Sequence, residues 1–99
     1  MREFIRELDL SDQAKIDAAI TTLEQGDFQS VEIKTLRGKI KELIVRSFRI
    51  IFFINGDVIY FVSGFKKKTR KTPRSEIENA QNILKLLNKQ KRRGKIKVR

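Results

Sequence analysis

A run of apolar, strand-forming residues in this chain ends abruptly in a cluster of positive charge. Five of the six residues 58–63 are β-branched or aromatic, and such side chains fit a pleated, largely buried surface. Six cations follow among the nine residues 66–74, and an unpaired cation is too costly to bury. The strand must therefore stop near Phe65 at an exposed rim, which is suited to binding a polyanion. The cations of this basic rim are Lys66, Lys67, Lys68, Arg70, Lys71 and Arg74.

The size and composition of the chain limit both its fold and its chemistry. With 99 residues, it is long enough for one compact core and too short for two. It contains no cysteine and no histidine, so disulfide and thiolate chemistry are excluded, and the usual acid/base residue and commonest metal ligand are missing. Any catalysis must therefore use lysine, arginine, tyrosine or carboxylate side chains, and we expect no metal and no other cofactor.

The distribution of apolar residues argues against a membrane protein. No uninterrupted apolar segment approaches the roughly 20 residues that span a bilayer. Charged residues interrupt the N-terminal segment, which therefore does not resemble a signal peptide. We expect a cytoplasmic protein with no membrane partner.

Positive charge is concentrated in the last third of the chain. Residues 1–64 contain 9 Lys and Arg against 10 Asp and Glu, whereas residues 65–99 contain 14 against 2. This asymmetry indicates a polyanionic partner, and nucleic acid fits better than a membrane because no tryptophan or broad apolar face accompanies the cations. The alternative is a solubilising surface with a disordered tail.

The first quarter of the chain has the pattern of two helices. Three apolar residues fall on one side of a helix over residues 2–8. Ser11 and Asp12 predict the start of a second helix, whose apolar residues recur at i, i+3, i+4 and i+7 from Ile16. Gly26 can take the left-handed conformation that ends it. We expect an antiparallel helical hairpin packed on a sheet.

The middle of the chain predicts three to four antiparallel strands, in an α+β fold. Apolar and polar residues alternate from Val31 to Leu36, as in a half-buried strand. Two further strands are expected, with a tight turn near Arg46. A hairpin turn at Asn55 and Gly56 should pair the second of them with the strand that ends at the basic rim. Because the last two strands are apolar at nearly every position, we expect both faces of the sheet to be covered, one by helices and the other by a partner. The expected strands are residues 31–36, 40–46, 48–54 and 57–65.

Arg49 is the exception in its otherwise apolar strand. A guanidinium among such neighbours must reach an anion or stack on an aromatic ring. The alternative is an arginine whose stem is buried and whose charged end reaches the surface.

A C-terminal helix and a basic tail complete the predicted organisation. Thr72 and Pro73 have the types expected for a helix N-cap and first helical residue, and an apolar stripe runs from Ile77 to Leu87, ending near Asn88. The remaining residues contain seven cations and no acid, so we expect a mobile tail. We therefore divide the chain into one domain, residues 1–88, and a flexible tail, residues 89–99.

The junction between the last strand and this helix resembles a signature of the phage-derived toxins in the HigB/RelE superfamily. That signature has the form G-F-x-K-K-T-x-K-T-P, followed by x-x-E-I-x-x-A, and it matches here from Gly64 to Ala80. An E-L-R element and a later aromatic-Arg pair are also typical, and Glu42-Leu43 and Phe48-Arg49 occupy those places. Ile44 stands where the arginine of the E-L-R element is expected, so the contribution of that arginine is either missing or has moved to Arg46.

The resemblance implies a RelE-like fold and a specific activity. It implies the toxin of a type II toxin-antitoxin system, a metal-independent endoribonuclease that cleaves mRNA on the ribosome and is neutralised by a cognate, HigA-like helix-turn-helix antitoxin. Arg49, Lys67 and Lys68 are the candidate catalytic residues. The candidate RNA-binding residues are Arg46, Lys66, Arg70, Lys71 and Arg74.

Two other functions suit the same sequence. ParE-like relatives on this scaffold poison DNA gyrase, and a fold does not by itself fix a function. A non-catalytic RNA-binding or ribosome-binding module would also explain the basic tail and the missing arginine at Ile44. The pair Lys67 and Lys68 favours the nuclease.

Overall fold

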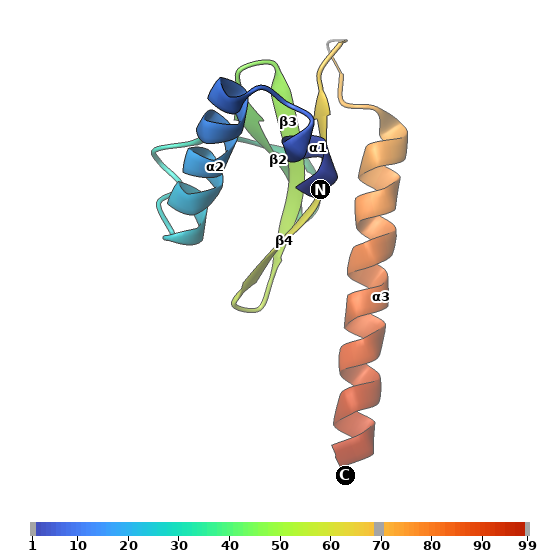
Figure 1. Ribbon diagram of the computed structural model, residues 1–99. Coiled ribbons are helices and arrows are strands. Elements are labelled where there is room, and N and C mark those ends of the chain that lie inside the picture. Colours follow the sequence, from blue (N-terminus) through green and yellow to red (C-terminus); the bar gives the residue numbers. More distant parts are fainter. Residues whose placement is uncertain (1, 69–70, 99) are drawn as a thin grey trace.

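The computed structural model describes residues 2–68 and 71–98, with side chains for residues 3–68 and 71–89. Two helices precede a four-stranded antiparallel sheet, and a long helix follows it (Figure 1). This arrangement confirms the predicted α+β fold with a helical pair, a sheet and a C-terminal helix. The elements are α1 (Arg2–Arg6), α2 (Leu10–Glu24), β1 (Glu32–Arg37), β2 (Ile40–Val45), β3 (Phe48–Asn55), β4 (Val58–Lys66) and α3 (Arg74–Val98).

The sheet is a meander in which each strand pairs with the next, in the order β1-β2-β3-β4. The predicted tight turn between β2 and β3 is confirmed, and Arg46 takes a positive φ of 56° in it. The hairpin between β3 and β4 was placed one residue too early, because Asn55 still pairs with Val58 and the turn consists of Gly56 and Asp57. Gly56 supplies the positive φ, 66°, that a two-residue hairpin turn requires.

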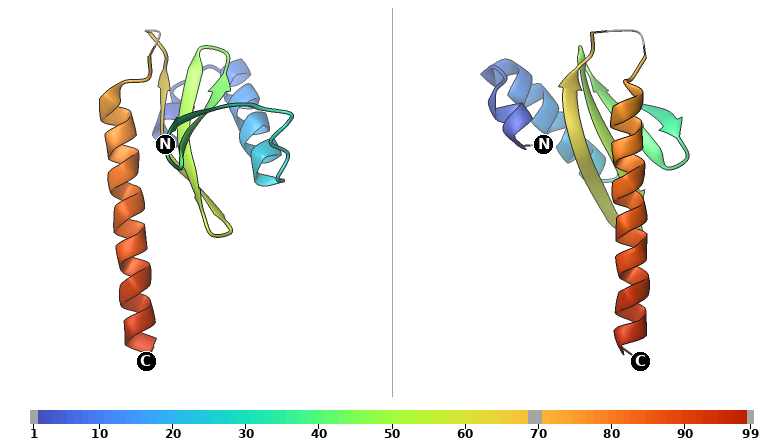
Figure 2. Two further views of the ribbon diagram at one scale, coloured as in Figure 1. Left: turned by 180° about the vertical axis from the view of Figure 1, so that it is seen from behind. Right: turned by 90° about the vertical axis from the view of Figure 1, so that its right-hand side faces the viewer.

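The two faces of the sheet are covered by different helices. Helices α1 and α2 lie against one face, which we call the hairpin face, and α3 lies against the other, the α3 face (Figures 1 and 2). The expectation that a partner covers the second face is therefore wrong for this part of the sheet, because Ala80 of α3 packs there against Ile40, Ile51 and Phe53. The buried core of the hairpin face consists of Ile16, Leu23, Leu43, Phe48, Ile50 and Phe52.

Helix α1 is held against the sheet by aromatic packing at a glycine. The rings of Phe4 and Phe48 meet edge to face, with centroids 6.0 Å apart. A methyl group at Gly64 would lie 2.5 Å from Phe4 Cδ2, too close for any real contact. Gly64, two residues before the first rim lysine, therefore leaves the space that Phe4 of α1 occupies.

The helix ends differ from the predictions in three places. Helix α2 starts earlier than Ser11, because the Asp9 side chain accepts a hydrogen bond from Asp12 N (2.8 Å) and caps it. Thr72 does not cap α3, because its hydroxyl donates to the buried Glu42 carboxylate instead. Helix α3 continues past Asn88 to Val98. The mobility predicted for residues 89–99 stays a prediction, since the side chains beyond Lys89 lie outside the described residues.

None of the helices in the described ranges has both the length and the apolar character needed to cross a membrane.

Candidate functional site

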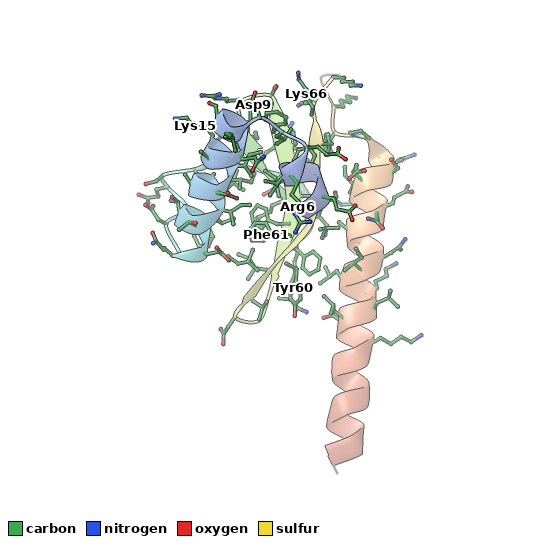
Figure 3. All side chains as sticks on the ribbon, in the orientation of Figure 1. Arg6, Asp9, Lys15, Tyr60, Phe61 and Lys66 are labelled. Atoms are coloured by element: carbon green, nitrogen blue, oxygen red, sulfur yellow. The ribbon has the colours of Figure 1, made fainter. Side chains whose placement is uncertain are left out.

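The basic rim begins where β4 ends. Lys66 is the last residue of β4 and pairs with Phe48 of β3. Figure 3 shows Lys66 at the end of the sheet near which Asp9 and Lys15 lie, and Tyr60 toward the other end. The backbone N–H of Lys67 donates to Ser47 O (2.7 Å), so the start of the rim is tied to the turn between β2 and β3.

All four rim lysines line one hollow between the end of β4 and the start of α3. Its volume is about 280 Å³. Lys67 is half-buried, whereas Lys66, Lys68 and Lys71 are exposed. A hollow lined by four lysines is suited to binding a polyanion. The lining residues are Phe65, Lys66, Lys67, Lys68, Lys71, Pro73, Ser75 and Glu76.

Two predicted RNA-binding residues of the rim lie elsewhere or cannot be placed. Arg74 is exposed at the start of α3, and its guanidinium lies 3.9 Å from Glu78 on the same helix. Arg70 lies outside the described residues. The structure therefore brings the lysines of the rim together but not Arg74.

Arg49 lies on β3 and is largely buried, with 14% of its side chain exposed. Its Nη1 donates to the carbonyl oxygens of Arg46 and Phe48, each at 2.9 Å. Its Nε lies 3.8 Å from Glu42 Oε1. We predicted that the Arg49 guanidinium would reach an anion or an aromatic ring, and in the structure it lies beside a carboxylate of the protein, that of Glu42.

Glu42 is the residue that joins Arg49 to the basic rim. Its carboxylate is fully buried on β2, where it faces Arg49 through Oε1 and accepts a hydrogen bond from the Thr72 hydroxyl through Oε2. One buried carboxylate therefore contacts both a candidate catalytic arginine and the segment that follows the lysines.

A second carboxylate connects α3 with β4. The Ser63 hydroxyl donates to Glu76 Oε2 at 2.5 Å, and Glu76 is the only acid in the described lining of the hollow. No three acidic side chains come together in a way that could hold a metal ion within the part of the chain described. The hollow thus combines several cations with one carboxylate.

The sequence pattern assigned no site role to Glu42, Ser63 or Glu76, and it assigned Thr72 only the role of a helix N-cap. A signal for Glu42 was present, because it alternates with Ile40 and so shares its buried face. The contacts of Ser63 and Thr72 join residues 13 and 30 positions apart, and no local pattern predicts such pairs.

Arg46 takes no part in this group of side chains. It lies in the turn after β2, and its Nη1 is 3.2 Å from Asp12 Oδ1 of α2. Ile44, where the resembled family has arginine, pairs in register with Arg49. Only the backbone carbonyl of Arg46 contacts Arg49.

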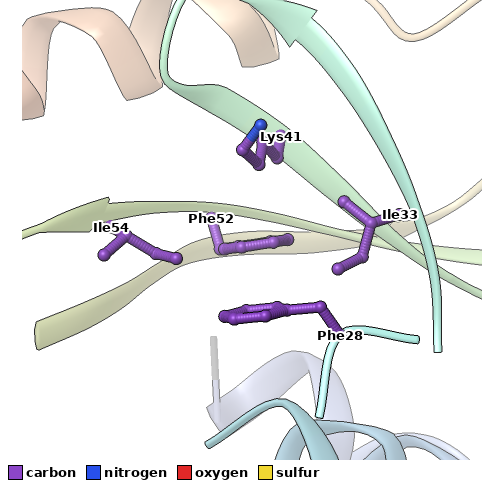
Figure 4. A pocket seen from close by; sticks show the side chains of 5 residues that line it. All are labelled: Phe28, Ile33, Lys41, Phe52 and Ile54. Atoms are coloured by element: carbon purple, nitrogen blue, oxygen red, sulfur yellow. The ribbon is translucent and has the colours of Figure 1, made fainter. Parts of the chain in front are cut away.

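A hollow on the hairpin face has a different character. It measures about 270 Å³ and is lined by Phe28, Ile33, Phe52, Ile54 and Lys41 (Figure 4). Lys41 Nζ donates to Thr35 Oγ1 at 3.1 Å. The lining contains no carboxylate, so this hollow lacks the mixture of charges found at the rim.

Tyr60 has the contacts of a packing residue. Its ring stacks on Phe53 with centroids 5.3 Å apart and an interplanar angle of 25°. It contributes to the cluster that α3 covers.

Comparison with known proteins assigns most of the chain, including the sheet and the basic rim, to one family. Residues 3–85 match the family described as phage derived protein Gp49-like (DUF891). The chain is also similar to "Probable endoribonuclease HigB1" from two strains of Mycobacterium tuberculosis, CDC 1551 / Oshkosh and H37Rv. The identity to each is 38% over 86 residues, covering 78% of this chain and 67% of the relative.

Proposed function

The chain belongs to the phage-derived Gp49-like family, and from this membership and its cation-lined hollow we propose that it is an endoribonuclease toxin of a type II toxin-antitoxin system. Its substrate in this proposal is mRNA on the ribosome. The observation that supports it most is the clustering of Lys66, Lys67, Lys68 and Lys71 around one hollow, because RNA supplies the matching negative charge. The similarity to proteins named as probable endoribonucleases gives the reaction type.

The proposed reaction uses a nucleophile that RNA itself provides. The 2′-OH attacks the adjacent phosphorus in line, and the bond to the 5′-oxygen of the next nucleotide breaks. The protein must position the strand and stabilise the charge that builds on the phosphate oxygens. In this proposal Lys67 and Lys68 supply that charge in the hollow. Arg49 is not among the lining residues, but it pairs with Phe65, which is one of them, and it adds a planar guanidinium from β3.

Glu76 is the group in the hollow that suits proton transfer. A carboxylate can take the proton from the 2′-OH if it lies within hydrogen-bond reach. Ser63 fixes one oxygen of Glu76 by a 2.5 Å hydrogen bond, which leaves the other oxygen to accept the proton. In this proposal Glu76 is the general base.

An antitoxin completes the proposed system. It is a HigA-like helix-turn-helix protein that neutralises the toxin by covering the basic rim with an acidic surface. The charge of this third of the chain, 14 cations against 2 acids, favours such a partner because opposite charges also speed association. The assembly belongs to the cytoplasm, where mRNA and ribosomes are found.

The test of this proposal removes the two central cations. Purified wild type should cleave mRNA on ribosomes, and the double variant Lys67→Ala, Lys68→Ala should lose cleavage and growth inhibition while its circular dichroism is unchanged. The matched control replaces two exposed lysines far from the hollow, Lys34→Ala with Lys39→Ala, and should stay active. Cleavage by the Lys67, Lys68 variant at the wild-type rate would refute the assignment.

A further inference from the structure

Glu42 stands apart among the charged groups of this protein. It is the only charged residue that is fully buried among the described side chains. A carboxylate in such a place is costly unless a cation and hydrogen bonds compensate it. Its contacts are therefore expected to serve a purpose beyond packing.

Those contacts come from two different elements. Arg49 reaches it from β3, and Thr72 reaches it from the segment before α3. The 3.8 Å between Arg49 Nε and Glu42 Oε1 is an ion-pair distance but too long for a hydrogen bond. Both of these atoms are buried and have no hydrogen-bond partner. The attraction between them is thus electrostatic, and it acts in a site shielded from water.

Two contacts fix residues that lie beside the rim lysines. The backbone N–H of Lys67 donates to Ser47 O, and the Thr72 hydroxyl donates to Glu42. Arg49 is fixed at its other side, where Nη1 bonds to the carbonyl oxygens of Arg46 and Phe48. Among the described side chains, Glu42 is the one that contacts both Arg49 and Thr72.

We infer that Glu42 is a positioning residue, which holds the Arg49 guanidinium and Thr72 in one arrangement beside the hollow. Thr72 lies between Lys71 and Pro73, which both line the hollow. The inference rests on the proposed function, in which Arg49 and Lys67 act on RNA. Neither Glu42 nor Arg49 is among the residues that line the hollow, but Arg49 pairs with Phe65, which does line it. In this inference Glu42, which is fully buried, acts through Arg49 and Thr72 and not on the substrate.

A double-mutant cycle tests whether Glu42 acts through Arg49. Glu42→Gln keeps the shape of the side chain and removes its charge, and it should lower kcat about 10-fold to 100-fold with KM within about 3-fold of wild type. Arg49→Lys keeps a cation beside Glu42 but loses the planar fork. In the Arg49→Lys background, adding Glu42→Gln should then lower kcat by less than about 3-fold. Equal losses in both backgrounds would show independent action and overturn the inference.

A second readout does not depend on cleavage. In ¹⁵N spectra, the Nε–H signal of Arg49, identified by its loss in Arg49→Lys, should shift and exchange faster with solvent in Glu42→Gln. The matched control, Glu24→Gln at the exposed end of α2, should leave it unchanged. If wild type proves inactive on RNA, the proposed function fails, and this signal alone decides the positioning role: an unchanged signal in Glu42→Gln overturns it.

Thr72 provides variants in case Glu42→Gln does not fold. Thr72→Val removes the hydroxyl that Glu42 accepts from, whereas Thr72→Ser retains it. The inference predicts a kcat loss and a displaced Arg49 signal in Thr72→Val, with rescue of both in Thr72→Ser. Identical behaviour of the two variants contradicts it.

Discussion

The two faces of the sheet are built from different kinds of contact. On the hairpin face, α1 and α2 bury a cluster of large apolar side chains around Phe48, Ile50 and Phe52. On the α3 face the buried apolar cluster is smaller, and α3 or the segment before it also meets the two buried polar residues, Glu42 and Asn55.

This difference suggests that one face mainly stabilises the fold and that the other mainly positions charged side chains. Apolar burial stabilises a fold with little dependence on direction. Ion pairs and hydrogen bonds depend on geometry and are costly when left unpaired. The hairpin face therefore suits a stabilising role, and the rim end of the α3 face suits the placement of charged groups. The predictions below test that division.

Phe52→Ala should produce the largest loss of stability. Phe52 is fully buried on the hairpin face, and a truncated core phenylalanine costs about 3–5 kcal/mol. Urea denaturation measures this loss, and the cleavage rate per folded molecule should not change. Phe28→Ala is the control, because Phe28 is 45% exposed and its truncation should cost much less. A loss below about 1 kcal/mol for Phe52→Ala would show that the hairpin face is not the stabilising one.

Arg49→Lys should affect the reaction and hardly affect stability. The cation beside Glu42 is retained, but the guanidinium fork is lost, and loss of one transition-state donor costs about 10²–10³-fold in rate. Single-turnover cleavage measures this effect. Arg37→Lys is a suitable control, because the Arg37 guanidinium donates to a side chain of another element, Gln81 of α3 (3.2 Å), but lies on β1 at the opposite edge of the sheet from β4. An unchanged rate in Arg49→Lys would leave Arg49 with a structural role only.

Asn55→Ala distinguishes two polar contacts on the same face. Asn55 Nδ2 donates to Asn88 Oδ1 at 3.3 Å, and loss of such a bond costs about 1 kcal/mol. The unfolding free energy should fall by that amount, and cleavage should be unaffected because this contact lies at the opposite end of β3 from Arg49. A rate loss comparable to that of Glu42→Gln would mean that the whole α3 face, and not only its rim end, supports the reaction.

Removal of the tail should have the smallest effect on chemistry. The cations from Lys89 onward lie beyond Leu87, the last apolar residue of the stripe that packs on the sheet. We propose that they bind ribosomal RNA, and each phosphate contact on a single strand contributes about 0.7 to the salt slope of log affinity. Truncation after Asn88 should flatten that slope and leave turnover at saturating ribosome nearly constant. A truncation that abolishes turnover while the slope persists would place the tail in the active site.

The sequence predicted the strands well because local pattern determines them. The β-branched and aromatic residues of the predicted strands placed all four strands within one residue of their observed ends, an accuracy expected for element boundaries. The turn at Gly56 was displaced by one position, because Asn55 forms a side-chain contact with α3 and remains in the strand.

The candidate site was predicted only in part. The lysines of the rim are neighbours in sequence, so their clustering around a hollow could be expected. The contacts of Glu42 with Arg49 and Thr72 could not, because they depend on the register between β2 and β3 and on where the chain before α3 crosses the sheet. Thr72 precedes a proline and was therefore predicted to cap α3. It does not, because its hydroxyl donates to the buried Glu42 carboxylate.

Binding of an RNA that cannot be cleaved tests the central claim most directly. A short mRNA fragment with methylated 2′-hydroxyl groups should be titrated into ¹⁵N-labelled protein, and the amide shifts mapped onto the sheet. The account predicts shifts at Phe65, Lys67 and Lys68 and in the first turn of α3, with α2 unaffected. Shifts confined to α2 and β1, with the rim unchanged, would contradict it.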